Sequence, residues 1–107
     1  MEAHDHIIIL ITTKDETEAE AIARRLLEEK KAACVNIIPK VDSRFWWQGR
    51  IDSASESLLV VKTAARLLPE IINTIKSCHS YKVPEIIALP IVGGSREYLD
   101  WIDGSLA

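Results

Sequence analysis

The chain has 107 residues, 48% hydrophobic and 27% charged, a balance that fits one globular domain and excludes a disordered chain. Thirteen basic and 16 acidic residues give a formal net charge of -3, which argues against a general nucleic-acid-binding protein. No apolar run approaches the ~20 residues that cross a bilayer, and two cysteines make no disulfide framework. We therefore expect a single domain over residues 1–107 in the reducing cytoplasm, with no nucleic-acid or membrane partner.

The first half of the chain predicts two strands and a helix. The run His6–Thr13 is continuous and β-branched, which predicts a central strand buried on both faces. Asp15 suits the N-cap of a helix over residues 16–31, which is acidic near its start and basic near its end. Residues 34–38 form a second strand, and Pro39 predicts a bulge or an edge position there.

The second half predicts two further strands and two helices. A tight turn is expected at residues 48–49, since glycine tolerates positive φ, and residues 51–63 return as a strand. A helix over 65–78 buries a stripe of leucine and isoleucine, a strand over 84–92 lies between prolines, and a short helix over 96–106 follows. This order, β-α-β-β-α-β plus a helix, predicts an α+β ferredoxin-like fold, with two helices covering one face of a four-stranded antiparallel sheet.

The central hairpin is long for so small a chain. Continuous pairing about the turn gives arms of ~15 residues, or about 50 Å, whereas a compact chain of this length is roughly 35 Å across. The hairpin should therefore extend past its own domain and carry Phe45, Trp46 and Trp47 at its tip. Because exposed aromatic side chains are costly in water, we predict a homo-oligomer. The alternative is that Pro39 breaks the strand and the tip folds back.

Five segments, taken in order, resemble the CutA divalent-cation tolerance family. They are residues 30–36 (KKAACVN), 43–49 (SRFWWQG), 61–63 (VKT), 81–86 (YKVPEI) and 98–102 (YLDWI). The resemblance runs from about residue 7 to 105 and implies a ferredoxin-like subunit in a tight homotrimer, similar in shape to PII signalling proteins. It also implies a non-enzymatic protein of metal tolerance that binds copper or another divalent cation and needs no organic cofactor.

Cys78 and His79 are the candidate metal ligands. A thiolate beside an imidazole suits copper or zinc, although two adjacent residues need a third donor from elsewhere or from another subunit. The resemblance implies a His-His pair here and a cysteine at the position of Ile11, so the chain departs from the family at both places. The alternative is that His79 caps the helix and Cys78 only packs. His4 and His6, two apart, are a weaker candidate for copper or nickel.

A second candidate site consists of polar residues within apolar segments. Lys62 follows four apolar residues and Glu85 begins a strand, and an embedded charge is costly unless it is paired. We expect a Lys62–Glu85 pair with Tyr81 nearby, either as a structural ion pair or as the floor of a small-ligand pocket. Trp47 of a neighbouring hairpin would roof that pocket, and Lys62 would favour an anionic metabolite.

Cys34 belongs to the same candidate pocket. In a hairpin without a bulge it lies opposite Thr63, one step from Lys62, whose charge could activate the thiol for metal binding or redox chemistry. The alternative is a small, buried packing residue. Two functions therefore remain open for the chain: a trimer that binds divalent metal in metal tolerance, and a small-molecule sensor or signalling scaffold with its pocket between subunits.

Overall fold

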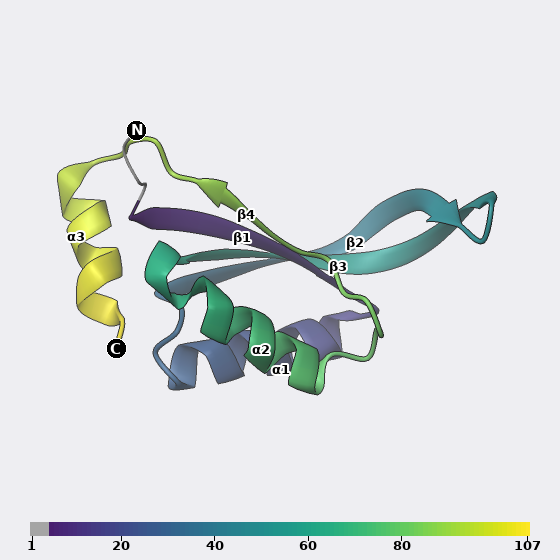
Figure 1. The fold of residues 1–107 in the computed structure, drawn as a ribbon, viewed down its shortest axis with the longest axis horizontal. Helices are drawn as coiled ribbons and strands as arrows, with labels where there is room; N and C mark the ends of the chain where they lie inside the picture. The colour runs from purple at the N-terminus through teal and green to yellow at the C-terminus, as the bar shows by residue number, and fades with distance from the viewer. Residues whose placement is uncertain (1–4) are drawn as a thin grey trace.

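The computed structural model describes residues 5–107, which form a four-stranded sheet and three α-helices (Figure 1). The strands are β1 (His6–Thr13), β2 (Cys34–Trp47), β3 (Arg50–Ala64) and β4 (Ile86–Pro90). The helices are α1 (Glu16–Glu28), α2 (Leu68–Cys78) and α3 (Arg96–Ser105), and one 3-10 turn, η1 (Ala65–Leu67), precedes α2. The predicted α+β class and the predicted order of elements are confirmed.

All strand pairs in the sheet are antiparallel, and the strand order is β2-β3-β1-β4. The predicted central position of β1 is therefore confirmed. It pairs with the inner half of β3 along its whole length and with β4 over residues 7–11. Figure 1 shows α1 and α2 together on one face of the sheet, as predicted, and α3 at the end of the sheet away from the hairpin.

The hydrophobic core lies between this sheet and the two helices. Alternate residues of β1, such as Ile9 and Ile11, are fully buried, whereas Ile8 and Leu10, which precede each of them, are only partly buried. The expectation that β1 is buried on both faces is therefore wrong for the subunit described here. Burying one leucine or isoleucine side chain stabilises a fold by roughly 1.5–3 kcal/mol, so each fully buried residue of this layer contributes to stability.

Helix α1 is shorter than its hydrophobic pattern predicts, because the backbone turns sharply after Glu28. Lys30 has a φ of 55°, a left-handed conformation that usually selects glycine. The amide of Lys31 then donates back to the carbonyl of Leu26 at 2.9 Å, which satisfies the end of the helix. In residues 5–107 no helix is both long enough and apolar enough to cross a membrane.

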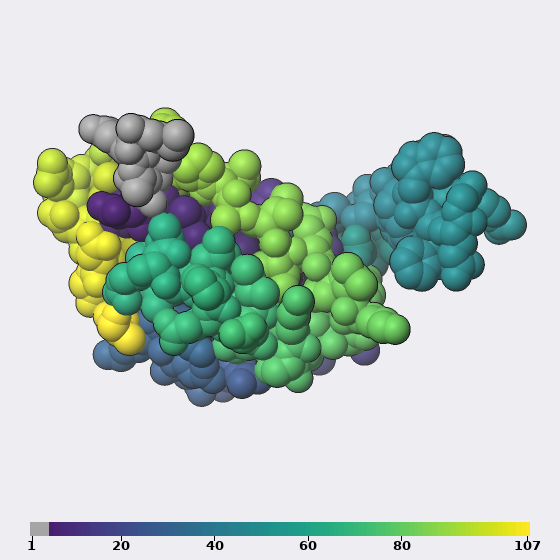
Figure 2. Space-filling view, in the orientation of Figure 1, coloured from purple at the N-terminus to yellow at the C-terminus, as the bar shows by residue number. Residues whose placement is uncertain are grey.

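Strands β2 and β3 form the predicted long hairpin, which projects well beyond the sheet (Figures 1 and 2). Residues 50–56 of β3 pair only with residues 41–47 of β2, because β1 reaches no further than Ser57. At the tip, Gln48 and Gly49 have φ values of 50° and 77°, as the type I′ turn of a two-residue loop requires.

Pro39 bends the hairpin without ending it. The register of β2 against β3 shifts by one residue between Ile38 and Val41, which is a β-bulge. Lys40, inside the bulge, has a φ of 60°. The predicted bulge is confirmed, and the alternative in which the tip folds back is wrong.

Candidate functional site

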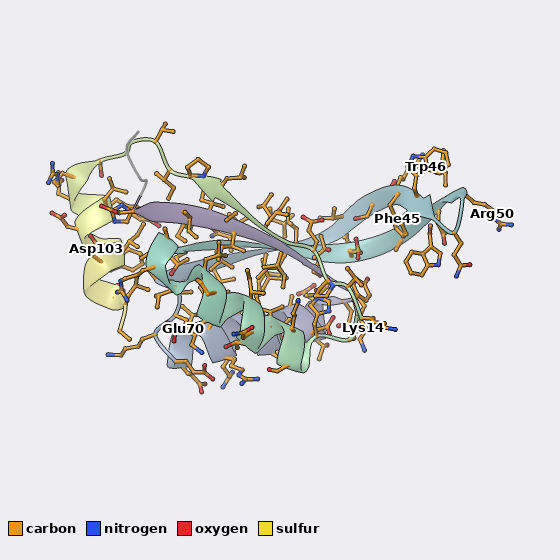
Figure 3. The ribbon with its side chains drawn as sticks, viewed as in Figure 1. Lys14, Phe45, Trp46, Arg50, Glu70 and Asp103 are labelled. Atoms are coloured by element: carbon orange, nitrogen blue, oxygen red, sulfur yellow. The ribbon has the colours of Figure 1, made fainter. Side chains whose placement is uncertain are left out.

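Three of the predicted pocket residues, Trp47, Tyr81 and Glu85, line one cavity that extends along the hairpin from its base, where Glu56 lies, toward Trp47 beside the turn. The cavity has a volume of about 490 Å³ and is lined by Thr12, Ser43, Arg44, Phe45, Trp47, Glu56, Tyr81, Val83 and Glu85. Small-molecule sites typically have volumes of about 300–1,000 Å³. Figure 3 labels Phe45 on the projecting hairpin, and its side chain is among those that line the cavity. Trp47 reaches the cavity from its own chain, whereas a neighbouring hairpin was expected to supply it.

Glu56 is the most buried charged group of this cavity, although its serine neighbours in the sequence do not predict a site residue. The residue is only 8% exposed, and its Oε2 accepts a hydrogen bond of 2.6 Å from the hydroxyl of Tyr81. Within residues 5–107 no ion pair reaches its carboxylate. The hydrogen bond from Tyr81 therefore links the segment after α2 to β3, and it is the contact that compensates the carboxylate charge of Glu56.

The electrostatic environment shifts the pKa of two groups in the cavity. Burial, the hydrogen bond to Glu56 and the charge of Glu56 raise the pKa of Tyr81 to about 12, so its hydroxyl stays protonated and donates at neutral pH. Burial, and then the charge of Glu56, raises the pKa of Glu85 above its usual value. Glu56 and Glu85 therefore repel one another when both are ionised.

Lys62 and Cys34 do not line this cavity. The bulge places Cys34 opposite Lys62 instead of opposite Thr63, and Lys62 Nζ lies 3.9 Å from Cys34 Sγ. The same ammonium group donates a hydrogen bond to Asn36 Oδ1. The expected Lys62–Glu85 ion pair is wrong, since none is formed among the described residues.

His79 is held as a structural residue. Its side chain is 0% exposed, with Nε2 2.8 Å from the carbonyl oxygen of Thr12 and Nδ1 2.9 Å from the amide nitrogen of Tyr81. Nε2 therefore donates and Nδ1 accepts, so both ring nitrogens are engaged. His79 also caps α2, its amide donating to the carbonyl oxygen of Ile75 at 2.8 Å, which confirms the capping half of the alternative. The other half, a small buried Cys78, is wrong, because Cys78 is exposed.

Cys78 differs from its neighbour because it is exposed. Its thiol lies 3.3 Å from the carbonyl oxygen of Thr74, a contact within its own helix. Among the described residues no group of three or more histidine, cysteine, aspartate and glutamate side chains is placed to hold a metal ion. Of the N-terminal histidines, His6 contacts Asp103 of α3 at 3.0 Å, and His4 lies outside the described residues.

The sheet face that α1 and α2 leave uncovered is apolar at its centre, and we call it the open face. Its central residues, which oppose one another across the strands, are Ile8, Leu10, Ile38, Leu58, Val60, Ile87 and Leu89. Ile38, Ile87 and Leu89 are about half exposed in the subunit. The open face has Lys62 at one end, and it carries Glu56 and the cavity at the other.

Comparison with known proteins assigns the chain to a family. The family described as CutA1 divalent ion tolerance protein matches residues 7–105. The chain belongs to this family. It is 50% identical over 98 residues to the divalent-cation tolerance protein CutA of Archaeoglobus fulgidus, covering 92% of this chain and 95% of that protein. It is 48% identical over 95 residues to the CutA protein of Thermus thermophilus, covering 89% and 92%.

Solved CutA structures have the same fold as this CutA1-family chain. The divalent cation tolerance protein Cut A1 of Thermus thermophilus superposes with a TM-score of 0.93 at 45% identity, over 95% of this chain and 99% of that one. CutA1 of Oryza sativa superposes with a TM-score of 0.94 at 38% identity, over 97% and 95%. The resemblance found in the five sequence segments is thereby confirmed.

A larger hollow of the CutA1-family chain lies elsewhere and contains none of the predicted site residues. It has a volume of about 650 Å³ and lies over α1 beside Ile37 of β2. Exposed α1 side chains such as Glu20 and Arg24 line it. The cavity at the hairpin base is therefore the better candidate site, because it alone combines a buried carboxylate with aromatic walls.

Proposed function

We propose that the chain acts in divalent-cation tolerance as a non-enzymatic homotrimer in the cytoplasm. The observation that carries this proposal is the family match over residues 7–105, since the family is named for divalent ion tolerance. The two curated relatives described above carry the same function in their names. The strand order supports a ferredoxin-like subunit, and the hairpin supports a PII-like trimer.

The open face and the hairpin tip support assembly. Trp46 and Ile51 are opposite one another near the tip and are 73% and 69% exposed. Figure 3 labels Trp46 at the far end of the hairpin, away from the helices. Each Å² of apolar surface removed from water contributes about 25 cal/mol, so covering the open face and the tip would stabilise the protein.

Light scattering coupled to size exclusion tests the trimer. We expect the mass of three chains for the wild type and smaller species for Val60→Glu, which places a charge at the centre of the open face. Trp47→Ala should weaken assembly without abolishing it. A matched control is Glu20→Gln on α1, which should remain trimeric. A folded wild-type monomer at micromolar concentration would overturn the proposal.

For the metal, we propose weak binding of copper or another soft divalent ion at the exposed thiol of Cys78. A thiolate prefers such ions, whereas His79 could join only after giving up its two hydrogen bonds. Calorimetric titration of Cu²⁺ and Zn²⁺ should show binding to the wild type and a loss of it in Cys78→Ala. Cys34→Ala is the matched control, because Cys34 lies on the sheet and is less exposed. Equal metal affinities of the wild type and Cys78→Ala would show that Cys78 is not a metal ligand.

A second candidate function is that of a small-molecule sensor or signalling scaffold. The convergence of Trp47, Tyr81 and Glu85 on one cavity with the buried Glu56 favours it. A thermal-shift screen of metabolites against wild type and Trp47→Leu is the test. A compound that stabilises the wild type but not the variant supports a sensor, and a response to soft metals alone contradicts it.

The cytoplasmic location is a separate part of the proposal. Both cysteines are free, as in a reducing compartment. Relatives differ in this respect: the Archaeoglobus fulgidus structure is described as that of a periplasmic protein, and a relative from Oryza sativa is described as chloroplastic. Fractionation of the native cells, with the chain detected by antibody, decides the matter, and recovery outside the cytoplasm would contradict it.

A further inference from the structure

We propose that the cavity at the hairpin base binds a small organic cation, whose ammonium or guanidinium group lies between Glu56, Glu85 and the aromatic walls. This inference rests on the second candidate function above and names the ligand class. It replaces the anionic metabolite that the sequence suggested, because Lys62 lies elsewhere and two carboxylates line the cavity.

The charge of the cavity is the first argument. Glu56 is more than nine-tenths buried and has a hydrogen bond from neutral Tyr81 but no cationic partner among the described residues. A buried carboxylate in this state is costly, and a second carboxylate, Glu85, adds repulsion. A bound cation between the two carboxylates would offset part of this charge and reduce the repulsion.

Among residues 5–107, Arg44 is the one cationic residue that lines the cavity, and its charge is already paired. Its guanidinium lies 3.1 Å (NH2 to Oδ2) and 3.5 Å (Nε to Oδ1) from the carboxylate of Asp42. This pair stands on the exposed part of β2 and does not reach Glu56 or Glu85. The cavity lining therefore keeps a net negative charge, which a cation from solution would compensate.

The aromatic side chains that line the cavity favour an organic cation over a metal ion. Phe45 and Trp47 are two residues apart on β2, so they lie on the same side of the strand, and Tyr81 adds a third ring. Aromatic faces attract ammonium and guanidinium groups. Calcium and magnesium instead need about six oxygen ligands, and two carboxylates are too few. A cavity of about 490 Å³ also holds a molecule much larger than an ion.

Benzamidine and benzamide are suitable probes, because they share one shape and only benzamidine is charged at neutral pH. We would titrate each into the full-length protein, in its native assembly, and follow the amide and indole resonances by NMR. We expect benzamidine to shift the signals of residues 43–47 and 81–85 and to bind about tenfold or more tightly than benzamide, as a charge-assisted contact requires.

Three variants assign the interaction. Glu56→Gln keeps an oxygen for the Tyr81 hydroxyl and removes the charge, so it should weaken benzamidine about tenfold and leave benzamide unchanged. Glu85→Gln, at an exposed position, should weaken benzamidine less and serves if Glu56→Gln fails to fold. Glu20→Gln, an exposed carboxylate on α1, is the matched control and should change nothing.

Each outcome has one meaning. Equal binding of benzamidine and benzamide would contradict the proposal that the ligand is a cation. The cavity would still be a ligand pocket, so the second candidate function would stand. Wild-type binding that survives Glu56→Gln and Glu85→Gln would also overturn the proposal. If neither probe shifts the cavity signals, the proposal fails. A structure of the assembly with a side chain of a second copy in the cavity would then assign the site to assembly. The copper titration of Cys78 is independent of all three results.

Discussion

The hydroxyl of Tyr81 donates a hydrogen bond of 2.6 Å to the carboxylate of Glu56 and so ties the segment after α2 to the root of the hairpin. This one contact joins a residue of the family-like segment 81–86 to a residue that looks unremarkable in the sequence. Since Glu56 has no cationic partner in residues 5–107, Tyr81 is its main compensation.

Tyr81→Phe should lower the free energy of unfolding by about 1–3 kcal/mol at pH 7, because it leaves a buried carboxylate without its donor. Tyr98→Phe is the matched control: Tyr98 is exposed on α3, and its loss of a hydroxyl should cost less than about 0.5 kcal/mol. Urea denaturation at one fixed protein concentration measures both. Equal stabilities for the two variants would show that the Tyr81–Glu56 bond contributes nothing.

His79→Ala should destabilise the protein by about 2–4 kcal/mol, since it removes a buried ring and leaves the Thr12 carbonyl and the Tyr81 amide without partners. Cys78→Ala should cost less than about 1 kcal/mol, because the thiol is exposed. Thermal unfolding of the metal-free proteins compares them. A His79→Ala variant as stable as Cys78→Ala would contradict the structural role of His79.

The protonation of Glu18 should lower the stability of the protein in acid. Burial alone would raise its pKa, but hydrogen bonds from the amide and hydroxyl of Ser80, and from the amide of Lys14, lower the pKa below its ordinary value of 4.5. A lowered pKa in the folded state adds stability above pH 4.5, and that stability is lost as the pH falls through the folded pKa.

Denaturation between pH 3 and 7 checks this expectation (about the range in which glutamate titrates). The acid loss of stability should be smaller in Glu18→Gln than in the wild type, and Glu20→Gln should keep the wild-type slope. Parallel curves for all three proteins would show that Glu18 is not responsible.

The ionisation of Glu85 should affect stability in the opposite direction to that of Glu18. Burial and the charge of Glu56 raise its pKa above 4.5, so the stability it contributes is present below pH 4.5 and is lost as the pH rises through the folded pKa. Glu85→Gln should therefore raise the melting temperature at pH 7 and lose this advantage below pH 4.5. A variant that is less stable than the wild type at pH 7 would contradict the repulsion between Glu85 and Glu56.

Much of the fold could be predicted because its signals are local. The side chain of Asp15 accepts from the amide of Glu18 at 2.8 Å, as its predicted capping role requires, and Gly49 supplies the positive φ of the turn. The end of α1 could not be predicted, because Lys30 adopts the left-handed conformation without the glycine that normally signals it.

The site was harder to predict because it depends on register. Lys62 and Glu85 both looked like embedded charges, but Lys62 lies opposite Ile8 whereas Ile86, next to Glu85, lies opposite Ile11. Three positions along β1 correspond to about 10 Å, too far for an ion pair. The Lys62–Glu85 pairing was therefore wrong, although Tyr81 and Glu85 do share a cavity with Trp47.

Glu56 was overlooked because serines surround it in a stretch that reads as solvent-exposed. A signal was available: in a strand it lies on the same side as Leu58 and Val60, the apolar residues of the open face. Its burial depends on Tyr81, which is 25 residues further along the chain, and no local pattern predicts that contact.

The outer ladder of the hairpin, where residues 41–47 pair only with residues 50–56, has no third strand to protect it. Two-stranded ribbons are marginal in water, so these amides should exchange with deuterium quickly in a dilute, dissociated chain and slowly in the assembled one. The amides of β1, held between two strands, should exchange slowly in both. The exchange rate of the outer ladder would thus report how long a subunit stays in the proposed trimer, residue by residue and without any label.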